Sequence, residues 1–490
     1  RKPRHQARNI IDTRWVLKWK YDKPPVDALT GKSSGPGVKI IRARLTVRGF
    51  KDRDKEQIAR YAGTSSRSSQ KVLVSEAVRN GWDICTTDIS KAFLQGVTYE
   101  ELSKLTGEPV REVNFYLPAY NVPLLQKLPG FETFNPQTEV LHCDKPGTGL
   151  VDAPRAFSMK LRQITEGKCG LKASSIDPEL CFNHVQNPLG YWEVRILMTK
   201  HVDDLKLTGR REAILYVIQE LQKVFGDLKV EWNEFTNCGV RHVQDVSTKE
   251  VTLDQCEYIK NMRPISHPQL KSDPTEYASP ELHKLFMSLL GAVAYASQTR
   301  VDALVFICAL QRHNAKPKVE HCVRLNKILK WLQRTPKKLK YSKLHVESNP
   351  KVAMAGNVPK DEDPEGLSNN QTFPHKTTTH LRVISDAAFK KEPEDGYSLR
   401  GALFLRCPGR TNQHMVCSYT TGHLLDWACK SQKCVTRSTF SAELLAAGDA
   451  TDQGILLSQV LWEIEVGPLE KKEARDRRDK GGFLPMSLYV

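Results

Sequence analysis

The chain has 490 residues, enough for about three domains of ordinary size, and its formal net charge is +17. The charge favours a polyanionic partner, and a net +11 of it falls within residues 1–60. No apolar run approaches the roughly 20 residues of a membrane span, which excludes a helical membrane protein, and twelve scattered cysteines without metal-finger spacing indicate reduced thiols, as in an intracellular protein.

The N-terminal region predicts four segments in order. They are a polar and poorly ordered segment at residues 1–13, a strand at 14–20, a loop rich in Pro and Gly at 21–38, and a second strand at 40–50. Arg42, Arg44 and Arg48 have the same parity in the second strand, so we expect their side chains on one side. The pattern leaves two interpretations open, a solvated edge strand or a surface for phosphates.

Two short stretches carry the chemistry of the chain. A helix over residues 68–80 leads into a strand that ends at Asp88, and two later strands meet at Asp203-Asp204. Adjacent carboxylates repel one another and add nothing to a strand pair, but a divalent cation between them removes the conflict. With Asp88 from an adjacent strand, the pair would form a site for two Mg²⁺, which bind the attacking and leaving oxygens of a phosphoryl transfer.

These stretches resemble a known set of motifs. Residues 88–96, Asp-x-x-x-Ala-Phe-Leu-x-Gly, and residues 202–204, Val-Asp-Asp, resemble the polymerase motifs of reverse transcriptases from copia-type LTR retrotransposons. The resemblance implies that Asp88, Asp203 and Asp204 are catalytic and hold two Mg²⁺ or Mn²⁺ ions.

The same resemblance implies roles in nucleotide binding. Residues 40–50 resemble the fingers strand of the family, which makes Arg44 the best candidate to bind the incoming triphosphate, followed by Arg48. Phe93 matches an aromatic residue that packs under the sugar and excludes a 2′-hydroxyl; without the motif it would be an ordinary core residue. Gly149 matches a glycine that allows the backbone to approach the substrate closely.

The chain departs from the family at several positions. Asp152 replaces the usual Gln, and an added acid beside a phosphate-rich ligand is electrostatically unfavourable. His201 replaces a Tyr and could stack on a base, while Lys200 could hold a phosphate. The segment from Tyr99 to Asn121 is longer than its counterpart and predicts a surface insertion.

The middle of the chain predicts helices. Residues 213–225 form an amphipathic helix, and residues 285–332 resemble a helical thumb or connection. The run from His321 to Val346 holds eight Lys and Arg residues and no acid. It is either a solvated face or a surface for the backbone of a nucleic-acid duplex, with these candidates: Lys327, Lys330, Arg334, Lys337 and Lys338.

Residues 347–376 are rich in Pro, Gly and polar residues and predict a linker. Beyond it come a strand through Asp386, two strands near residues 401–405 and 415–419, and a helix with Glu443. This order resembles a ribonuclease H domain, and Asp386 and Glu443 match its first two metal-binding carboxylates. The chain stops before the next carboxylate of that family, so we expect a truncated site that cleaves RNA–DNA hybrids poorly.

We therefore predict an α+β fold: a right-hand polymerase with fingers, palm and helical thumb or connection, followed by an incomplete ribonuclease H-like α/β domain. The expected ranges are 1–13 for the N-terminal segment, 14–265 for the fingers and palm, 266–346 for the thumb or connection, 347–376 for the linker and 377–490 for the ribonuclease H-like domain. The resemblance runs from about Trp15 to Val490. The chain lacks an initiator Met, so we expect it to be a piece of a longer polyprotein.

The expected function is RNA-directed DNA polymerisation, with an RNA template, a DNA primer, their hybrid and dNTPs as partners and with no membrane involvement. Other Pol segments, such as integrase and protease, or a second copy of the chain are further candidate partners, and the resemblance places the chain in cytoplasmic particles or the nucleus. The alternative is a decayed or domesticated copy that binds nucleic acid without copying it. An unrelated basic scaffold would not explain why the three aspartates occur with their motif neighbours.

Overall fold

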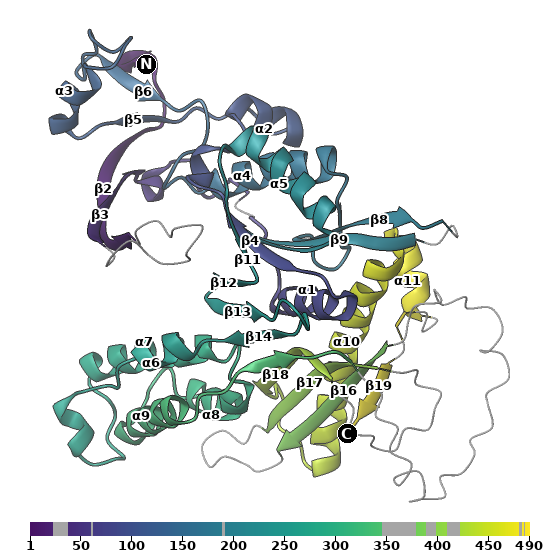
Figure 1. Cartoon of the computed structure of the whole chain (residues 1–490). Helices are drawn as coiled ribbons and strands as arrows, with labels where there is room; N and C mark the ends of the chain where they lie inside the picture. The colour runs from purple at the N-terminus through teal and green to yellow at the C-terminus, as the bar shows by residue number, and fades with distance from the viewer. Residues whose placement is uncertain are drawn as a thin grey trace, which may run out of the picture. The chain divides into compact units, whose positions relative to one another are not determined.

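The computed structural model describes residues 1–22, 38–59, 62–188, 192–344, 379–388, 398–408, 422–479, 483–484 and 486–490 (Figure 1). The chain divides into two compact units. The first unit holds residues 1–63, 89–169 and 223–226, and the second unit holds residues 64–88, 170–222 and 227–490. This division cuts across the predicted ranges, since residues 14–265 fall in both units. The predicted linker at 347–376 and the predicted strand at 415–419 lie outside the described residues.

The first unit is built on a five-stranded sheet of order β1-β6-β5-β2-β3. Its strands are β1 Lys2–Pro3, β2 Ile10–Asp22, β3 Val38–Val47, β5 Asn114–Tyr116 and β6 Glu139–His142, and its helices are α2 Tyr99–Thr106, α3 Val122–Leu125 and α4 Ala153–Arg162. The two strands predicted at 14–20 and 40–50 are confirmed as β2 and β3, although β3 ends before Arg48. The expectation of poor order for residues 1–13 is wrong, because β1 pairs with β6 and Ile11 on β2 is buried.

The segment from Tyr99 to Asn121 is not a surface insertion. It forms α2 and β5, and Tyr99, Leu102 and Val113 are buried in the core cluster of the first unit. A capping box at Thr98 fixes the start of α2, which is the local reason for a helix here. The predicted insertion therefore contributes residues to the core, which its length relative to the family counterpart did not reveal.

The second unit contains a six-stranded antiparallel sheet of order β11-β4-β10-β9-β8-β7. Its strands are β4 Ile84–Asp88, β7 Lys172–Ala173, β8 Leu180–Gln186, β9 Trp192–His201, β10 Asp204–Gly209 and β11 Lys229–Trp232, and the helices nearest in sequence are α1 Arg67–Asn80 and α5 Arg211–Phe225. The predicted helices at 68–80 and 213–225 and the strand ending at Asp88 are confirmed. The Ser66 side chain caps the start of α1, and Gly81 ends it in the left-handed conformation.

A second sheet and a group of helices follow in the same unit. The strands, in the order β12-β13-β14-β15, are β12 Glu234–Asn237, β13 Val240–Gln244, β14 Val251–Asp254 and β15 Leu339–Tyr341. The helices are α6 Cys256–Asn261, α7 Pro280–Ala296, α8 Leu304–Gln311 and α9 Val319–Arg334, as expected for residues 285–332. Leu325, Leu329 and Leu332 on α9 lie in the core of this helical group, which confirms the predicted apolar face.

The C-terminal sheet has the order β18-β17-β16-β19. Its strands are β16 Thr379–Ala388, β17 Leu399–Pro408, β18 His423–Ser431 and β19 Met486–Tyr489, and its helices are α10 Thr439–Val466 and α11 Lys471–Asp479. β16 pairs antiparallel with β17 and parallel with β19. The predicted strand through Asp386, the strand near residues 401–405 and the helix with Glu443 are confirmed as β16, β17 and α10, whereas β18 was not predicted.

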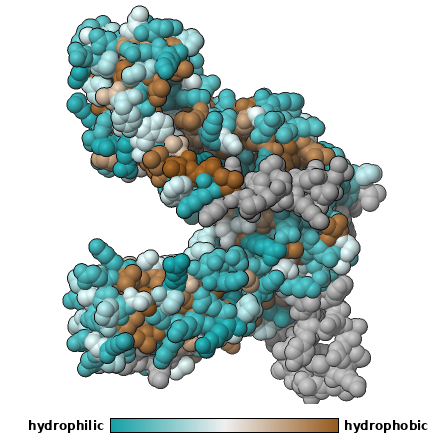
Figure 2. All heavy atoms as spheres, turned by 60° about the vertical axis from the view of Figure 1, so that its left-hand side comes forward, coloured by the Kyte–Doolittle hydropathy of each residue, from teal (hydrophilic) through white to brown (hydrophobic). Residues whose placement is uncertain are grey.

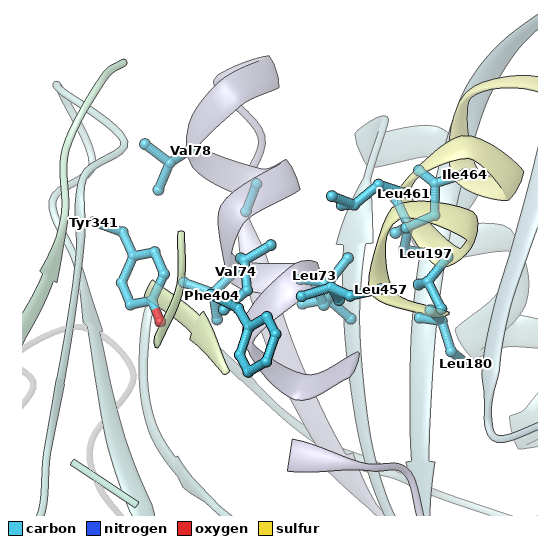
Figure 3. Close-up of a cluster of buried hydrophobic side chains, with 14 of the residues drawn as sticks. Leu73, Val74, Val78, Leu180, Leu197, Tyr341, Phe404, Leu457, Leu461 and Ile464 are labelled. Atoms are coloured by element: carbon cyan, nitrogen blue, oxygen red, sulfur yellow. The ribbon is translucent and has the colours of Figure 1, made fainter. Parts of the chain in front are cut away.

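One hydrophobic core joins the three sheets of the second unit, whereas the helical group has a core of its own. Leu73 and Val74 of α1 lie in the same cluster as Leu197 of β9, Phe404 of β17 and Leu461 of α10 (Figure 3). Nearly every side chain of α1 from Lys71 to Val78 is buried, so this helix has core on all sides. The C-terminal sheet is thus packed into the same core as α1 and the strand that ends at Asp88.

A buried ion pair crosses the same core. The fully buried guanidinium of Arg406 on β17 pairs with the equally buried carboxylate of Glu76 on α1. Arg406 also lies 3.5 Å from a carboxylate oxygen of Glu465 on α10 and donates to Thr379 at 3.0 Å. Because unpaired charges are costly in such a place, these contacts fix how α1, β17 and α10 fit together.

The molecular surface is mainly hydrophilic, with hydrophobic groups exposed at several places (Figure 2). Among the exposed hydrophobic side chains are Trp15, Leu17 and Trp19 of β2 and Ile41 of β3. Within the part of the chain that the structure describes, no helix is long and apolar enough to cross a membrane. The cysteines of that part are free thiols.

Candidate active site

The Asp203-Asp204 pair lies at the tip of the hairpin formed by β9 and β10. His201 pairs with Asp204, so Val202 and Asp203 form a two-residue loop. Val202 has φ of 61°, whereas the loop type with positive φ at its first residue normally has glycine there. A β-branched residue in this conformation costs of order 1–3 kcal/mol, and such strain concentrates at functional sites.

The register of the sheet brings the first motif to this tip. Asp88, the last residue of β4, is the direct cross-strand partner of Asp204 on β10. Side chains of such a pair lie on the same face of a sheet, about 5 Å apart at Cβ. The structure thus places two of the three predicted aspartates opposite one another and the third, Asp203, in the adjoining loop.

The carboxylate of Asp204 is held by three donors. Its Oδ1 accepts hydrogen bonds from Asn237 Nδ2 at 2.7 Å and Thr86 Oγ1 at 3.2 Å, and its Oδ2 accepts one from the backbone N–H of Cys238 at 3.0 Å. Donors on both oxygens fix the rotamer of the carboxylate. Asp204 is therefore oriented before any ligand binds.

The three aspartates fit a divalent cation by their chemistry. Mg²⁺ prefers carboxylate oxygens, and Asp88, Asp203 and Asp204 supply them at one end of a strand pair. Among the residues that the structure describes, however, no three His, Cys, Asp or Glu side chains are grouped as a ready-made metal cage. The three carboxylates that could bind a cation thus lie at one end of the hairpin, but their side chains are not arranged as a complete metal site.

The structure corrects the expected role of Lys200. Its side chain is buried on β9, with Nζ 3.4 Å from a carboxylate oxygen of Glu179, so it does not offer a charge to a phosphate. His201, the next residue, is half-buried at the end of β9 and forms a backbone bridge with Thr64.

The predicted nucleotide-binding residues lie in the first unit. Arg44 is exposed on β3, opposite Val16 of β2, and its side chain is available to a ligand. Arg48 follows β3 and pairs with Asp12 at 2.9 Å, so its charge is already engaged within the unit. Phe93 is half-buried in a 3₁₀ turn, Ala92–Leu94.

Two further expectations for this unit concern Gly149 and Asp152. Gly149 has φ of 100°, and a Cβ there would lie 2.1 Å from the carbonyl oxygen of Val47, so close contact with β3 explains the glycine without a substrate. Asp152 is buried and paired with Arg111, which also binds Asp52 at 2.6 Å. Asp152 thus shares one guanidinium with Asp52 inside the unit, where burial raises the pKa of Asp152, and its expected repulsion of a phosphate stays a prediction.

The basic run on and after α9 is partly neutralised by acids from other segments. Lys337 lies 3.1 Å from a carboxylate oxygen of Asp302, and Lys338 lies 3.7 Å from one of Asp254. The helical candidates are exposed on α9, away from its buried leucines: Lys327, Lys330 and Arg334. Exposed ion pairs contribute little energy, so all five cations remain accessible to a polyanion.

The two predicted acids of the ribonuclease H-like region are placed differently. Asp386 is exposed on β16, and strand alternation directs it to the face opposite Ala387, which packs against Ala442 of α10. Glu443 is on α10 itself, and its Oε2 is buried without a hydrogen-bond partner. The unpaired carboxylate oxygen of Glu443 could bind a cation. Strand alternation, however, directs Asp386 to the other face of the sheet, away from α10 and Glu443.

Comparison with known proteins supports the resemblance. No family model matches the chain. The Pol polyprotein from transposon RE1 of Arabidopsis thaliana is 22% identical over 484 residues, covering 93% of this chain and 26% of the relative. The Pol polyprotein from transposon TNT 1-94 of Nicotiana tabacum is 23% identical, covering 94% of this chain and 30% of the relative.

The chain is a distant homologue of copia-type Pol polyproteins. It spans between a quarter and a third of the length of these relatives. Among solved structures, a foamy viral protease-reverse transcriptase in complex with RNA/DNA hybrid has a TM-score of 0.42 at 11% identity, covering 91% of this chain and 48% of that one.

Sequence reasoning missed a group of buried cations behind the aspartates of this Pol homologue. Lys206 on β10 is buried, donates to the carbonyl oxygen of Gln70 at 3.1 Å, and lies 3.2 Å from Nε2 of His242. Burial lowers the pKa of Lys206 to about 8 and that of Lys71 on α1 to about 7. One signal was available in the sequence, since Lys206 lies between two leucines, Leu205 and Leu207.

Proposed function

We propose that the chain is the reverse transcriptase region of a retrotransposon Pol polyprotein. It extends a DNA primer on an RNA template with dNTPs. The observation that supports this best is the cross-strand pair of Asp88 and Asp204 beside the strained Val202-Asp203 loop. A strained loop that carries adjacent carboxylates is costly for stability, and phosphoryl-transfer chemistry gives a reason for it.

The roles of the chain's residues follow from their placement. Asp88, Asp203 and Asp204 would hold two Mg²⁺ or Mn²⁺ ions, which stabilise the charge that develops when the primer 3′-hydroxyl attacks the α-phosphate of a dNTP. The hydrogen bonds to Asp204 hold its carboxylate in one orientation, so no energy is spent on reorientation during the reaction.

The first unit would bind the nucleotide. Arg44 supplies an exposed cation for the triphosphate, with Arg48 as a weaker candidate because Asp12 already binds it. Phe93 would pack under the sugar and select deoxynucleotides. Gly149 remains a candidate only for shaping the backbone at the end of β3.

The basic residues on and after α9 would bind the phosphate backbone of the RNA–DNA hybrid. Phosphate contacts give sequence-independent affinity that falls as salt rises. We therefore expect hybrid binding to weaken with salt, and to weaken further when Lys327, Lys330 and Arg334 are replaced together by Gln.

Primer extension on poly(rA)/oligo(dT) with Mg²⁺ or Mn²⁺ tests the proposal. We expect incorporation by the chain and a loss of at least about 10²-fold in Asp203→Asn, which keeps the shape of the side chain and removes its charge. Glu231→Gln, on β11 of the same sheet, removes a partly exposed acid that pairs with Lys229; it is the matched control and should retain activity. No incorporation by the unmodified chain while it still binds the hybrid would refute polymerase activity.

That negative result would support the second candidate, a copy that binds nucleic acid without copying it. His201 in place of the family Tyr and Asp152 in place of the family Gln favour this candidate, although Asp152 is buried and pairs with Arg111. Ribonuclease H activity through Asp386 and Glu443 is proposed as weak, given the placement of the two acids. Integrase or protease segments and a second copy of the chain remain proposed partners, in a cytoplasmic particle or the nucleus.

A further inference from the structure

The turn between β12 and β13 reaches the carboxylate of Asp204. Asn237 pairs with Val240, so Cys238 and Gly239 form a two-residue loop with φ of 49° and 73°. Positive φ at both residues is the tight hairpin loop that usually holds Asn-Gly or Asp-Gly. A Cβ on Gly239 would lie 1.9 Å from the hydroxyl oxygen of Tyr295, so this loop is fitted closely against α7.

The side chain of Asn237 points its amide nitrogen toward Asp204 and leaves its own oxygen without a hydrogen bond. Its Nδ2 donates to Asp204 Oδ1 at 2.7 Å and lies 3.1 Å from Thr86 Oγ1, while its own Oδ1 is buried without a hydrogen-bond partner. Leaving a buried acceptor unsatisfied is unfavourable for folding. The orientation is thus better explained by the donors that it places on Asp204 than by stability alone.

Cys238 connects the aspartate to the helical group. Its backbone N–H donates to Asp204 Oδ2 at 3.0 Å, and its carbonyl oxygen accepts a hydrogen bond from the hydroxyl of Tyr295 at 2.7 Å. Tyr295 lies near the end of α7, whose core is shared with α8 and α9. One peptide segment therefore links Asp204 to the helical group, in which α9 carries the basic residues Lys327, Lys330 and Arg334.

We propose that Asn237 and Cys238 are positioning residues for Asp204, and that Tyr295 transmits the position of α7 to this carboxylate. The expected effect on catalysis rests on the proposed polymerase function. The hydrogen bonds from Asn237 and Cys238 to Asp204, and from Tyr295 to Cys238, do not depend on activity. The inference explains why the chain has a tight Cys238-Gly239 loop at this place, which neither the aspartate motifs nor the basic run explains.

Single-turnover incorporation tests the consequence. Asn237→Leu removes the donor while nearly keeping the side-chain shape, and we expect kcat to fall about 10²-fold with little change in KM for dNTP or in hybrid affinity. Tyr295→Phe should lower kcat by about 2- to 10-fold, the effect of one hydrogen bond. The matched control is Tyr258→Phe, because Tyr258 contacts the Tyr295 ring but donates to Ala292, and it should leave kcat unchanged.

Chemical labelling tests the link without relying on catalysis. A water-soluble carbodiimide with glycine ethyl ester, read by peptide mass spectrometry, should modify Asp203 in every variant and Asp204 only after Asn237→Leu or, more weakly, Tyr295→Phe. Equal labelling of Asp204 in the unmodified chain and in both variants would overturn the inference. If Asp204 is protected from labelling in the unmodified chain but that chain incorporates no nucleotide, the polymerase function would be refuted and the positioning of Asp204 by Asn237 and Cys238 would stand.

Discussion

Replacing Arg406 by Met should destabilise the second unit strongly. The change removes the cation that faces the buried Glu76 and leaves the carboxylate without its main partner. Although burial opposes the charged form of Glu76, the guanidinium of Arg406 and then that of Arg79 hold its pKa at about 2 instead of the ordinary 4.5. That difference corresponds to about 3 kcal/mol, and removing one partner of a buried pair typically costs about 3–5 kcal/mol, so we expect a loss in this range in the free energy of unfolding.

Equilibrium unfolding in urea measures this loss, with circular dichroism and tryptophan fluorescence as probes. Trp427 on β18 is buried in the same unit and should report the same transition. Arg400→Met is the matched control, because Arg400 is on the same strand and pairs with the half-exposed Asp449; such a pair contributes at most about 1 kcal/mol. A loss below about 1 kcal/mol for Arg406→Met, equal to that of the control, would refute the assigned role of the buried pair.

Three further predictions concern Glu76, Lys71 and Gly149. Because the folded pKa of Glu76 lies below its ordinary value, its stabilising contribution is present above pH 4.5 and lost toward pH 2, so the deficit of Glu76→Gln in urea unfolding should be smaller at pH 3.5 than at pH 7. Burial lowers the pKa of Lys71 to about 7, so the cost of its buried charge is full below pH 7 and declines toward pH 10.5; Lys71→Met should therefore raise the free energy of unfolding more at pH 6 than at pH 9. Gly149→Ala forces a Cβ toward Val47 at positive φ and should lower the stability of the first unit by about 1–3 kcal/mol, measured as a lower Tm, whereas an unchanged Tm would contradict the close contact.

Local features of the fold were predictable from sequence because their causes are local. The helix α1 follows from its apolar pattern, its Ser66 cap and Gly81, and β4 follows from the apolar run before Asp88. The relation between Asp88 and Asp204 was accessible through the resemblance, which supplied a pairing that no local pattern contains.

Other features depend on partners that are remote in sequence. Asn237 has no motif around it, and its importance comes from a hydrogen bond to a residue 33 positions away. Tyr99 was assigned to an insertion because its segment is longer than the family counterpart, and sequence length does not show that Tyr99 is buried. The basic run appeared free of acids for the same reason, since Asp302 and Asp254 come from other segments.

The enclosure of α1 has a consequence for how the protein is made. Glu76 and the Arg406 that neutralises it are 330 residues apart, and a ribosome that adds 5–20 residues per second takes about 20–60 s to cover that distance. During this interval the helix has emerged, but the sheet that completes its surroundings has not been synthesised. The apolar residues of the nascent helix must therefore stay accessible to chaperones until the C-terminal strands leave the ribosome.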